Sequence, residues 1–452
     1  MDRRKFIKTG ALSAAGLALS PSLFADEVSS GVILPGSVQS DGKRANVSDG
    51  ISDHMKVSGY VREKSHRIPV VAESDVVVAG GGVAGVAAAV NAARQGASVI
   101  LIEKANFLGG LWTGGLVLPV LATHGKGRTK AWDKAAQGFC SEICDTLLEK
   151  GWAINPLNPK ADPEAAKYLL DKKLAEAGVV TLYNSTVCGV TMSGNKIQSI
   201  LVSCNAGRIA IKCAVAVDAS GDGLLFSFAG DPYEARRYHI SSSYRLGGLR
   251  PDQTFGRPTP IPQMRYNVEG SMGAVDGLDI FKVSATQQQH RLAIWEKVQQ
   301  KRQEPGFEDL FLMELAPATG VRVTRVLESL HNVTLDESME WTQFEDVIGM
   351  SGVCDPFNYK GRRIEREDRP VWQIPYRSLV PRQSRNLLVA GRCFGYDQGI
   401  AWDAREISTC MVTGQASGIA AAMAARSGKA AKDIDVEDLQ RRLRQNNVRL
   451  DF

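Results

Sequence analysis

The fold is decided by one stretch of the sequence, Asp75-Val76-Val77-Val78-Ala79-Gly80-Gly81-Gly82-Val83-Ala84-Gly85. Its first five residues form an apolar run bounded by glycine, which is typical of a parallel strand buried on both faces. Its last six residues have the spacing GxGxxG, and the alanine-rich run after them predicts a helix over 86–93 with a cap at Gly96. Such glycines place phosphates on the N-terminus of the helix. The predicted contacts of a bound dinucleotide are Gly80, Gly82, Val83, Ala84 and Gly85.

A second apolar strand, over 98–102, ends in an acidic residue, Glu103. This carboxylate lies 18 positions after Gly85, close to the roughly 20 expected of the acid that accepts the ribose hydroxyls of a dinucleotide. Its negative charge would repel a 2′-phosphate at that position. The order of strand, glycines, helix, strand and acid therefore predicts an α/β protein with a Rossmann-like dinucleotide-binding domain.

A second glycine cluster follows at once, Phe107-Leu108-Gly109-Gly110-Leu111-Trp112-Thr113-Gly114-Gly115. Plain nicotinamide-binding domains rarely carry one there. This part of the chain resembles the glutathione-reductase-type FAD fold, in which such a glycine pair lies against the flavin side of the cofactor. More narrowly, it resembles FAD-dependent oxidoreductases related to the heterodisulfide reductase flavoprotein subunit. The cofactor contacts that the resemblance implies here are Lys104, Gly109, Gly110, Leu111 and Thr113.

Three later segments carry the same resemblance. Residues 216–223 read AVDASGDG, similar to the family's DATGDG, and residues 320–325 read GVRVTR, like its GxRxxR. Residues 386–418 resemble the strand and helix that close the FAD domain, with the positive end of the helix dipole aimed at the flavin. In these segments and the β-rich stretch 180–204, the implied cofactor contacts are Val187, Ser220, Gly221, Asp222, Gly391, Arg392, Gln415 and Ala416.

A flavin carries the redox chemistry itself, so the protein must supply the acid or base. His124, just after the second glycine cluster, is a candidate for proton transfer or for a covalent tether to the flavin, and an ordinary loop histidine is the alternative. His239 is a second candidate, because it lies near the start of the segment 233–359, the expected substrate cap. Either histidine is also consistent with a surface position.

The chain departs from the family after the GRC element. Where relatives often read Ser-x-x-His, this sequence has Gly395-Tyr396-Asp397-Gln398, and a glutamine cannot shuttle a proton near neutral pH. Tyr396 and Asp397 are candidate replacements for the histidine. Arg405 is a candidate electrostatic partner for an anionic substrate.

The composition is that of a globular protein, with 452 residues, 44% hydrophobic and 23% charged. The net charge of +5 does not indicate a nucleic-acid partner, because +3 of it lies in the segment 1–25 and no basic stripe follows. The basic run 360–363 soon mixes with acids up to Arg369, which predicts a solvated loop, with an anion clamp as the alternative.

The eight cysteines are scattered without a CxxC pair, so we expect no metal site, and a disulfide stays unassigned. Cys140 and Cys144 stand four positions apart in a helix predicted over 131–148. Burial as small hydrophobic residues explains most of the cysteines.

Residues 1–25 are interpreted as an export signal. Arg3-Arg4-Lys5-Phe6-Ile7-Lys8 precedes a weakly apolar stretch, 9–24, with Ala25 where a peptidase could cut. This resembles a twin-arginine (Tat) signal peptide, which implies export of the folded protein to the periplasm or another extracytoplasmic space. The apolar stretch 9–24 is too short to span a bilayer, so we expect no stable membrane span in the mature chain.

The expected organisation is a Rossmann-like FAD/NAD(P)-binding domain built from discontinuous segments, with an α+β substrate cap between them. The expected parts are a signal peptide (1–25), a linker arm (26–71), the FAD-binding domain (72–235 and 370–430), the cap (236–369) and a C-terminal tail (431–452).

The predicted function is hydride transfer between the flavin and a small organic substrate. An anionic or polyhydroxy substrate is preferred, on the basis of Arg236, Arg237, Arg245, Arg322 and Arg377. One alternative is a flavin-binding subunit that relays electrons to a redox partner, or a flavoprotein without catalysis. A nicotinamide dehydrogenase is less favoured, because no second complete GxGxxG unit occurs. The oligomeric state stays open.

Overall fold

The computed structural model describes residues 51–59, 61, 63, 65, 67–129, 132–250 and 252–452. The expected signal peptide, 1–25, lies outside the described residues, as does the first half of the arm. The described residues belong to one compact unit, and the elements below all lie within it. No helix in the described ranges is long and apolar enough to cross a membrane.

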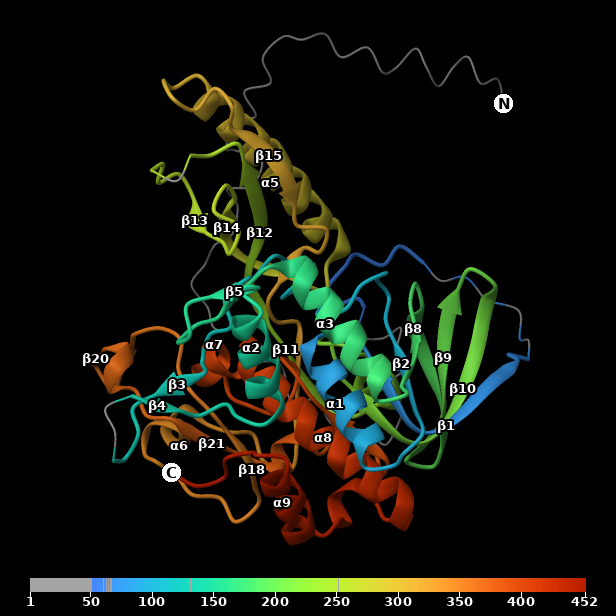
Figure 1. Cartoon of the computed structure of the whole chain (residues 1–452). Helices are drawn as coiled ribbons and strands as arrows, with labels where there is room; N and C mark the ends of the chain where they lie inside the picture. Colours follow the sequence, from blue (N-terminus) through green and yellow to red (C-terminus); the bar gives the residue numbers. More distant parts are fainter. Residues whose placement is uncertain are drawn as a thin grey trace, which may run out of the picture. The chain divides into compact units, whose positions relative to one another are not determined.

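A mixed β-sheet forms the centre of the nucleotide-binding part (Figure 1). Its strands run in the order β7-β2-β1-β10-β9-β8, and β22 pairs with the second half of β10. Strands β7, β2, β1, β10 and β22 are parallel, whereas β8, β9 and the first half of β10 form an antiparallel meander. The strand bounds are β1 Val70–Ala79, β2 Val99–Ile102, β7 Val180–Leu182, β8 Thr186–Ser193, β9 Lys196–Cys204, β10 Gly207–Asp218 and β22 Leu387–Val389. The prediction of a Rossmann-like α/β fold is confirmed.

Two helices, α1 (Val83–Arg94) and α8 (Ile407–Ser427), pack side by side against this sheet (Figure 1). Glycines make this close approach possible. A Cβ atom at Gly414 would lie 2.2 Å from the carbonyl oxygen of Ala84, and one at Gly418 would lie 2.1 Å from that of Ala88. The GQASG segment of the sequence therefore sets the spacing between the helix that follows the glycine loop and the helix that closes the domain.

The cap is built on a second sheet, in which β12 (Arg237–Gly247) pairs with β14 (Arg265–Asp276), β15 (Phe311–Leu315) and β16 (Gly320–Val321). The long helix α5 (Ile280–Arg302) packs on this sheet and buries Ile294 and Val298 against Tyr244 and Leu246. The cap therefore has its own small core.

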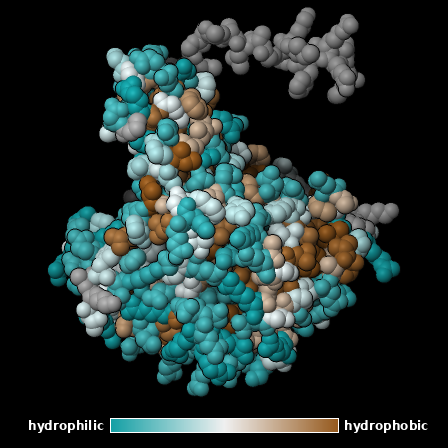
Figure 2. Space-filling view, viewed as in Figure 1, coloured by the Kyte–Doolittle hydropathy of each residue, from teal (hydrophilic) through white to brown (hydrophobic). Residues whose placement is uncertain are grey.

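Figure 2 shows hydrophilic side chains over most of the face seen in Figure 1, with hydrophobic ones gathered over β9 and β10.

The remaining helices and several strand pairs lie outside the two sheets. The helices are α2 Phe139–Glu149, α3 Pro163–Glu176, α4 Leu224–Ala229, α6 Leu335–Met339, α7 Ala401–Ala404 and α9 Val436–Gln445. The strand pairs are β3 His124–Gly125 with β4 Asp133–Lys134, β5 Ala153–Ile154 with β6 Lys160–Ala161, β11 Tyr233–Ala235 with β17 Arg325–Leu327, and β18 Val347–Ser351 with β21 Trp372–Pro375. Strand β11 precedes β12 and strand β17 follows β16, so the pairing of β11 with β17 joins the two ends of the cap segment to each other.

Two local predictions differ from the structure. The sequence predicts one helix over 131–148, but α2 begins only at Phe139, because β4 pairs with β3 and Gly138 adopts a φ of +66° before the helix. The sequence also predicts a solvated loop over 360–369. Its last residue, Arg369, is instead buried in an ion pair with Asp403, which no local sequence pattern indicates.

Candidate active site

The first glycine loop forms an open cradle at the N-terminus of α1. The strand β1 ends at Ala79, and Gly80 turns the chain with a φ of +104°, where a Cβ atom would lie 2.5 Å from the carbonyl oxygen of Ala219. Gly82 is the N-cap of α1, and no side chain caps the helix there. A Cβ atom at Gly82 would meet nothing within 4 Å. Open space therefore lies beside Gly82 at the N-terminus of α1, as the close approach of a pyrophosphate requires.

Glu103, at the end of β2, ties this loop to the sheet. One carboxylate oxygen accepts a hydrogen bond of 2.6 Å from the N–H of Gly81, and the other accepts one of 2.7 Å from the N–H of Ala105. The side chain is nearly buried. Each carboxylate oxygen has a second lone pair, so these contacts orient the group and still leave acceptors for ribose hydroxyls.

The DASGDG turn lies beside the glycine loop and is organised by Asp218. This buried carboxylate accepts hydrogen bonds from the hydroxyl of Ser220 at 2.6 Å and from the N–H groups of Leu225 and Phe226 at 2.7 and 3.2 Å. Burial raises the pKa of Asp218 above its ordinary value, against the effect of these hydrogen bonds. Asp218 is therefore the anchor of the turn that presents Ser220 and Gly221.

Asp222 and Arg392 join this turn to the GRC segment. Arg392 donates from Nη2 to Asp222 at 2.6 Å and from Nε to the carbonyl oxygen of Gly221 at 2.7 Å. Lys104 lies 3.7 Å from the same carboxylate. Burial would raise the pKa of Asp222, but Arg392 and Lys104 outweigh it and hold this pKa below its ordinary value. The predicted contacts Lys104, Asp222 and Arg392 thus form one charged group at the cradle.

The second glycine cluster closes the cradle from the other side. The N–H of Gly109 donates to the carbonyl oxygen of Gly81 at 2.8 Å, and a Cβ atom at Gly110 would lie 3.2 Å from the Cα of Gly82. Gly391 approaches the start of α1 so closely that its Cβ atom would lie 2.9 Å from the Cβ of Ala84. The two glycine clusters and the GRC segment, far apart in sequence, therefore meet around one helix N-terminus.

The remaining predicted cofactor contacts lie nearby but have other partners. The hydroxyl of Thr113 donates to the carbonyl oxygen of Leu108, Leu111 is half-buried, and Val187 is buried in the edge strand β8. Gln415 accepts a hydrogen bond of 2.9 Å from the N–H of Phe139 and donates one of 3.3 Å to Asn91. Ala416 is fully buried. A cofactor contact at these positions stays a prediction, and the two ends of the Gln415 amide already have partners within the protein.

A separate cluster of side chains forms where the cap meets the N-terminus of α8. Tyr238 comes from β12, and Trp402 and Arg405 come from α7 and its end. The Arg405 guanidinium carbon lies 5.2 Å from the ring centre of Tyr238 and 4.8 Å from that of Trp402, and the two ring centres are 5.7 Å apart. The Nε of Arg405 is buried without a hydrogen-bond partner in the described part of the chain.

Arg322 brings a second positive charge to this cluster. It follows β16 and donates to the carbonyl oxygen of His239 at 3.3 Å. Burial and the charge of Arg405 lower the pKa of Arg322 below its ordinary value. No salt bridge joins a carboxylate to Arg322 or Arg405 in the described part of the chain, although the charge of the neighbouring Glu406 acts on both arginines. An anion placed here would relieve the repulsion between the two arginines.

Glu406 completes the cluster and was not predicted from the sequence. It follows Arg405, forms the N-cap of α8 and is 8% exposed. One feature of the sequence could have indicated Glu406, because this acid stands directly before a helix of almost uniformly small and apolar residues. Its significance depends on burial by segments distant in sequence, which a local pattern does not reveal.

His124 lies near this region, in β3. Its Nδ1 lies 2.8 Å from the hydroxyl of Thr123, and its ring stacks on Trp132 at 6.3 Å between centres. Burial, with Lys134 as a further cause, lowers the pKa of His124 below its ordinary value. The histidine is therefore neutral at neutral pH and held in place by neighbours, and its catalytic or tethering role stays a prediction.

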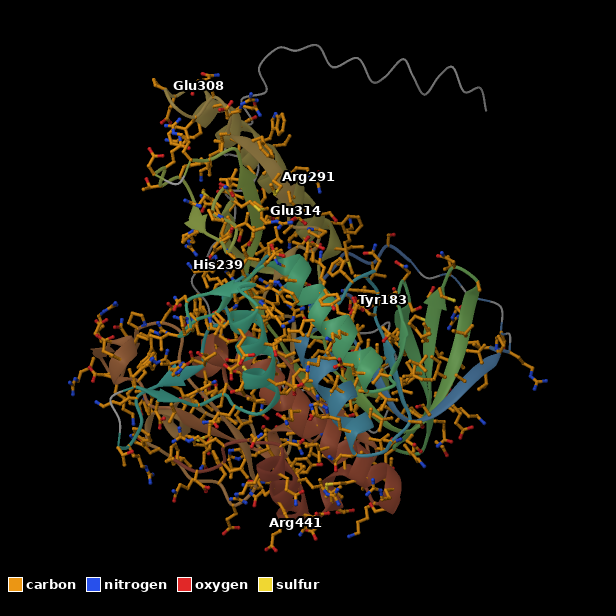
Figure 3. All side chains as sticks on the ribbon, in the orientation of Figure 1. Tyr183, His239, Arg291, Glu308, Glu314 and Arg441 are labelled. Carbon is orange, nitrogen blue, oxygen red and sulfur yellow. The ribbon has the colours of Figure 1, made fainter. Side chains whose placement is uncertain are left out.

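The other predicted catalytic residues have structural partners or face outward. Tyr396 is fully buried and donates to the carbonyl oxygen of Arg392 at 2.7 Å, and burial raises its pKa. The carboxylate of Asp397 accepts from the N–H groups of Leu335 and Ile400, both at 3.1 Å, and Gln398 beside it is exposed. His239 is exposed, and Figure 3 shows it near the base of the cap. Catalytic roles for these residues stay predictions, and Arg405 alone of the predicted group lies in the cluster with Tyr238.

Comparisons with known proteins agree with the cradle. The family model described as FAD dependent oxidoreductase matches residues 75–245 and 236–443. Thiamine thiazole synthase of Aeropyrum pernix is 29% identical over 192 residues, which cover 39% of this chain and 62% of that relative. The chain therefore matches less than two thirds of that relative's length.

Solved structures of low identity align with most of the chain. A geranylgeranyl bacteriochlorophyll reductase-like protein from Thermoplasma acidophilum is 16% identical over 83% of each chain, with a TM-score of 0.44. The p-nitrophenol 4-monooxygenase of Pseudomonas putida is 12% identical over 83% of this chain and 89% of its own, with a TM-score of 0.43. The family match covers most of the chain and includes both glycine clusters. This protein therefore belongs to the FAD-dependent oxidoreductase family, and its cofactor is FAD.

Proposed function

We propose that this oxidoreductase transfers a hydride between FAD and a small anionic organic substrate held by Arg322 and Arg405. The observation that carries the proposal is the meeting of these two arginines, from the cap and from the end of α7, without a paired carboxylate among the described residues. The bound flavin would supply the two-electron donor or acceptor. The protein would bind and orient the substrate's anionic group.

The other arginines from which an anionic substrate was predicted do not share this property. Arg236 pairs with Glu234 at 2.6 Å, Arg245 pairs with Glu314, and Arg377 pairs with Asp346 at 2.9 Å. Figure 3 shows Glu314 farther out on the cap than His239. Arg237 is exposed and alternates with the buried Tyr238 along β12, so its side chain leaves the opposite face of the strand. Only Arg322, of the five, is available to a substrate at the junction.

The aromatic side chains of the cluster support the same proposal. Tyr238 is nearly buried, whereas Trp402 is 45% exposed, and both rings lie next to the Arg405 guanidinium. Contact with aromatic rings restrains an arginine and leaves its N–H groups free to donate. Such an arginine is suited to bind a carboxylate with two parallel hydrogen bonds.

The test is a set of three arginine variants in FAD-loaded protein, Arg322→Gln, Arg405→Gln and the matched control Arg237→Gln. Anionic compounds, hydroxy acids first, are screened anaerobically for bleaching of the flavin, and KM is measured for those that bleach it. We expect at least a tenfold rise in KM for each cluster variant, since one lost charged hydrogen bond costs about 1.5–3 kcal/mol, and no change for Arg237→Gln. Bleaching by neutral polyhydroxy compounds only, or equal KM values in the four proteins, would reject the proposal.

We propose further that the folded, FAD-loaded protein is exported. The support is the sequence Arg3-Arg4-Lys5-Phe6-Ile7-Lys8 and the weakly apolar stretch after it. Fractionation of cells that express the full chain or the Arg3→Lys, Arg4→Lys double variant tests this directly. We expect the flavin-containing protein in the periplasmic fraction for the full chain and inside the cell for the variant, and the same distribution for both would contradict export.

A further inference from the structure

Glu406 is an unusual carboxylate among those that the structure describes. It is 8% exposed, and as the N-cap of α8 it makes no side-chain hydrogen bond to the helix. Its own backbone is engaged, because its N–H donates to the carbonyl oxygen of Asp403 at 3.2 Å and its carbonyl oxygen accepts from the N–H of Cys410 at 2.8 Å. The backbone of Glu406 is therefore fixed, while its carboxyl group has no hydrogen-bond partner in the described ranges.

Other buried carboxylates among the described residues have hydrogen-bond or ion-pair partners within the protein. Asp403 accepts from the N–H of Cys354 at 3.0 Å and pairs with Arg369. Asp231 accepts from the N–H groups of Gln383 and Ser384 at 2.9 and 3.0 Å. Asp218 and Glu103 accept several N–H or O–H groups each, as described above. Glu406 has no such partner, and neither of its carboxyl oxygens is a fully buried atom, so the carboxyl group reaches space that a small ligand can enter.

The charges around Glu406 come from four segments of the chain. Its titratable and charged neighbours are Arg405 and Asp403 from α7 and its end, Arg322 from the cap, Asp355 and Cys354 from the segment after β18, and Cys410 from α8. Burial is the main cause that raises the pKa of Glu406 to about 7. The charges of the two acids, Asp403 and Asp355, also raise this pKa, and the charges of the two arginines lower it only in part. A carboxyl group of this kind holds and releases a proton near neutral pH.

We propose that Glu406 is the catalytic acid–base group of this enzyme and exchanges a proton with the substrate that Arg322 and Arg405 hold. This inference rests on the proposed function and adds to it the residue that takes the place of the family histidine. Glu406 follows Arg405 in the chain, so one side chain would bind the anion while its neighbour reaches the reacting end of the same small molecule.

The step balances for oxidation of an alcohol. The substrate loses the hydrogen of its C–H bond with both electrons to the flavin, and the proton of its O–H bond moves to the Glu406 carboxylate. A C=O bond forms, the substrate is oxidised by two electrons, and the flavin is reduced by two. In the reverse direction the protonated Glu406 donates that proton. Oxidation therefore needs Glu406 ionised, and its rate should rise as the pH increases through about 7.

Two variants separate this role from a structural one. Glu406→Gln keeps the size and burial of the side chain but cannot exchange a proton. Asp355→Asn is the matched control, because Asp355 is exposed and its charge raises the pKa of Glu406 from outside the cluster. Removing that charge should lower the pKa of Glu406 and leave the acid in place. A purely structural Glu406 would show no such dependence on Asp355.

Two readouts are taken on the FAD-loaded proteins. The first is kcat for oxidation against pH, with the anionic substrate found in the screen. We expect Glu406→Gln to lower kcat by about 100-fold or more and to lose the rise near pH 7, and Asp355→Asn to move that rise to lower pH at a similar maximal rate. An unchanged kcat profile in Glu406→Gln would overturn the proposal.

The second readout needs no substrate. The absorption spectrum of the bound flavin is titrated between pH 5 and 9, and we expect a one-proton change near pH 7 that is absent in Glu406→Gln and displaced downward in Asp355→Asn. A change near pH 7 that persists in Glu406→Gln would overturn the role of Glu406. If no anionic compound bleaches the wild-type flavin, the proposed function fails, and this titration alone then decides whether Glu406 is the titrating group beside the flavin.

Discussion

The guanidinium carbon of Arg405 lies 5.2 Å from the ring centre of Tyr238, which joins the end of α7 to the first strand of the cap. This contact connects two segments that are far apart in sequence. Because the GxGxxG cradle is complete without the cap, binding of FAD and binding of substrate depend on different residues. Variants should therefore separate the two properties.

Replacement of Tyr238 tests how Arg405 is held. Tyr238→Ala removes the ring beside the guanidinium and should raise KM by about 2- to 30-fold, which corresponds to the roughly 0.5–2 kcal/mol of a cation–π contact. Tyr238→Phe keeps the ring and should leave KM within about twofold of the wild type. Steady-state kinetics on the two variants check this, and an equal rise in both would assign the effect to the hydroxyl rather than to the ring.

Gly82→Ala should remove the flavin and leave the fold intact. Gly82 has a φ of −65°, which alanine adopts readily, and its Cβ atom would meet no protein atom within 4 Å. The same methyl group would occupy the space of the pyrophosphate. We expect apoprotein with the melting temperature of wild-type apoprotein but an affinity for FAD at least tenfold lower.

Gly273→Ala is the control for this change, because its Cβ atom would also meet nothing within 4 Å but Gly273 lies in the cap strand β14. Calorimetric titration of the two apoproteins with FAD gives the affinities. Full FAD affinity in Gly82→Ala would show that the cradle at α1 is not the phosphate site.

Gly414→Ala should act on stability instead. Its Cβ atom would lie 2.2 Å from the carbonyl oxygen of Ala84, so α8 must move away from α1. Overpacking of this kind costs about 1–3 kcal/mol. We expect a lower melting temperature for the variant both with and without FAD, whereas Gly270→Ala in β14, which would meet no atom within 4 Å, should melt like the wild type. A melting temperature unchanged by Gly414→Ala would show that the helices tolerate a wider spacing.

The stability of the helix layer should depend on pH through Glu142. This carboxylate in α2 accepts from Arg94 of α1 at 2.8 Å and from Lys173 of α3 at 2.7 Å. Burial would raise the pKa of Glu142, but these two partners lower it to about 2. A group with a lowered pKa stabilises the folded state above its ordinary pKa of 4.5, and this contribution is lost as the pH falls toward 2.

The measurement is the difference in unfolding free energy between the wild type and Glu142→Gln, from urea melts at several pH values. We expect about 1 kcal/mol near neutral pH, since the pair is partly exposed to solvent, and a steady decrease below pH 4.5. Glu149→Gln, at the exposed end of the same helix α2, serves as the control. A difference that stays constant down to pH 3 would contradict the role of the carboxylate charge.

The sequence was sufficient for the cofactor cradle but not for the acid. The glycines of the cradle could be predicted because their role depends on the local backbone conformation, which a short sequence pattern determines. Glu103 could be predicted because it ends a strand at a regular distance after the glycines. Glu406 could not be recognised, since its properties depend on Asp355 and Arg322, which approach it only in the folded chain. The departure at Gln398 raised the question of which residue carries the proton, and the answer stays a prediction. Asp397 and Tyr396, the nearest polar residues, turn out to bond to the backbone of their own surroundings.

Prediction of an anionic substrate from a count of arginines was equally limited. Arg236, Arg245 and Arg377 are paired with acids at very different separations in the sequence, so no local pattern separates them from Arg322. The ion pairs seen in the fold make the distinction, because an arginine that already has a carboxylate partner has little to offer a ligand.

The most direct test of the account compares one hydroxy acid that bleaches the flavin with its uncharged amide. Both are mixed anaerobically with the FAD-loaded protein, and the rate of bleaching is followed against concentration. We predict saturable bleaching by the acid and a value of kcat/KM at least tenfold lower for the amide, because the amide cannot compensate the charges of Arg322 and Arg405. Equal bleaching by acid and amide would contradict the proposal that these two arginines bind the substrate.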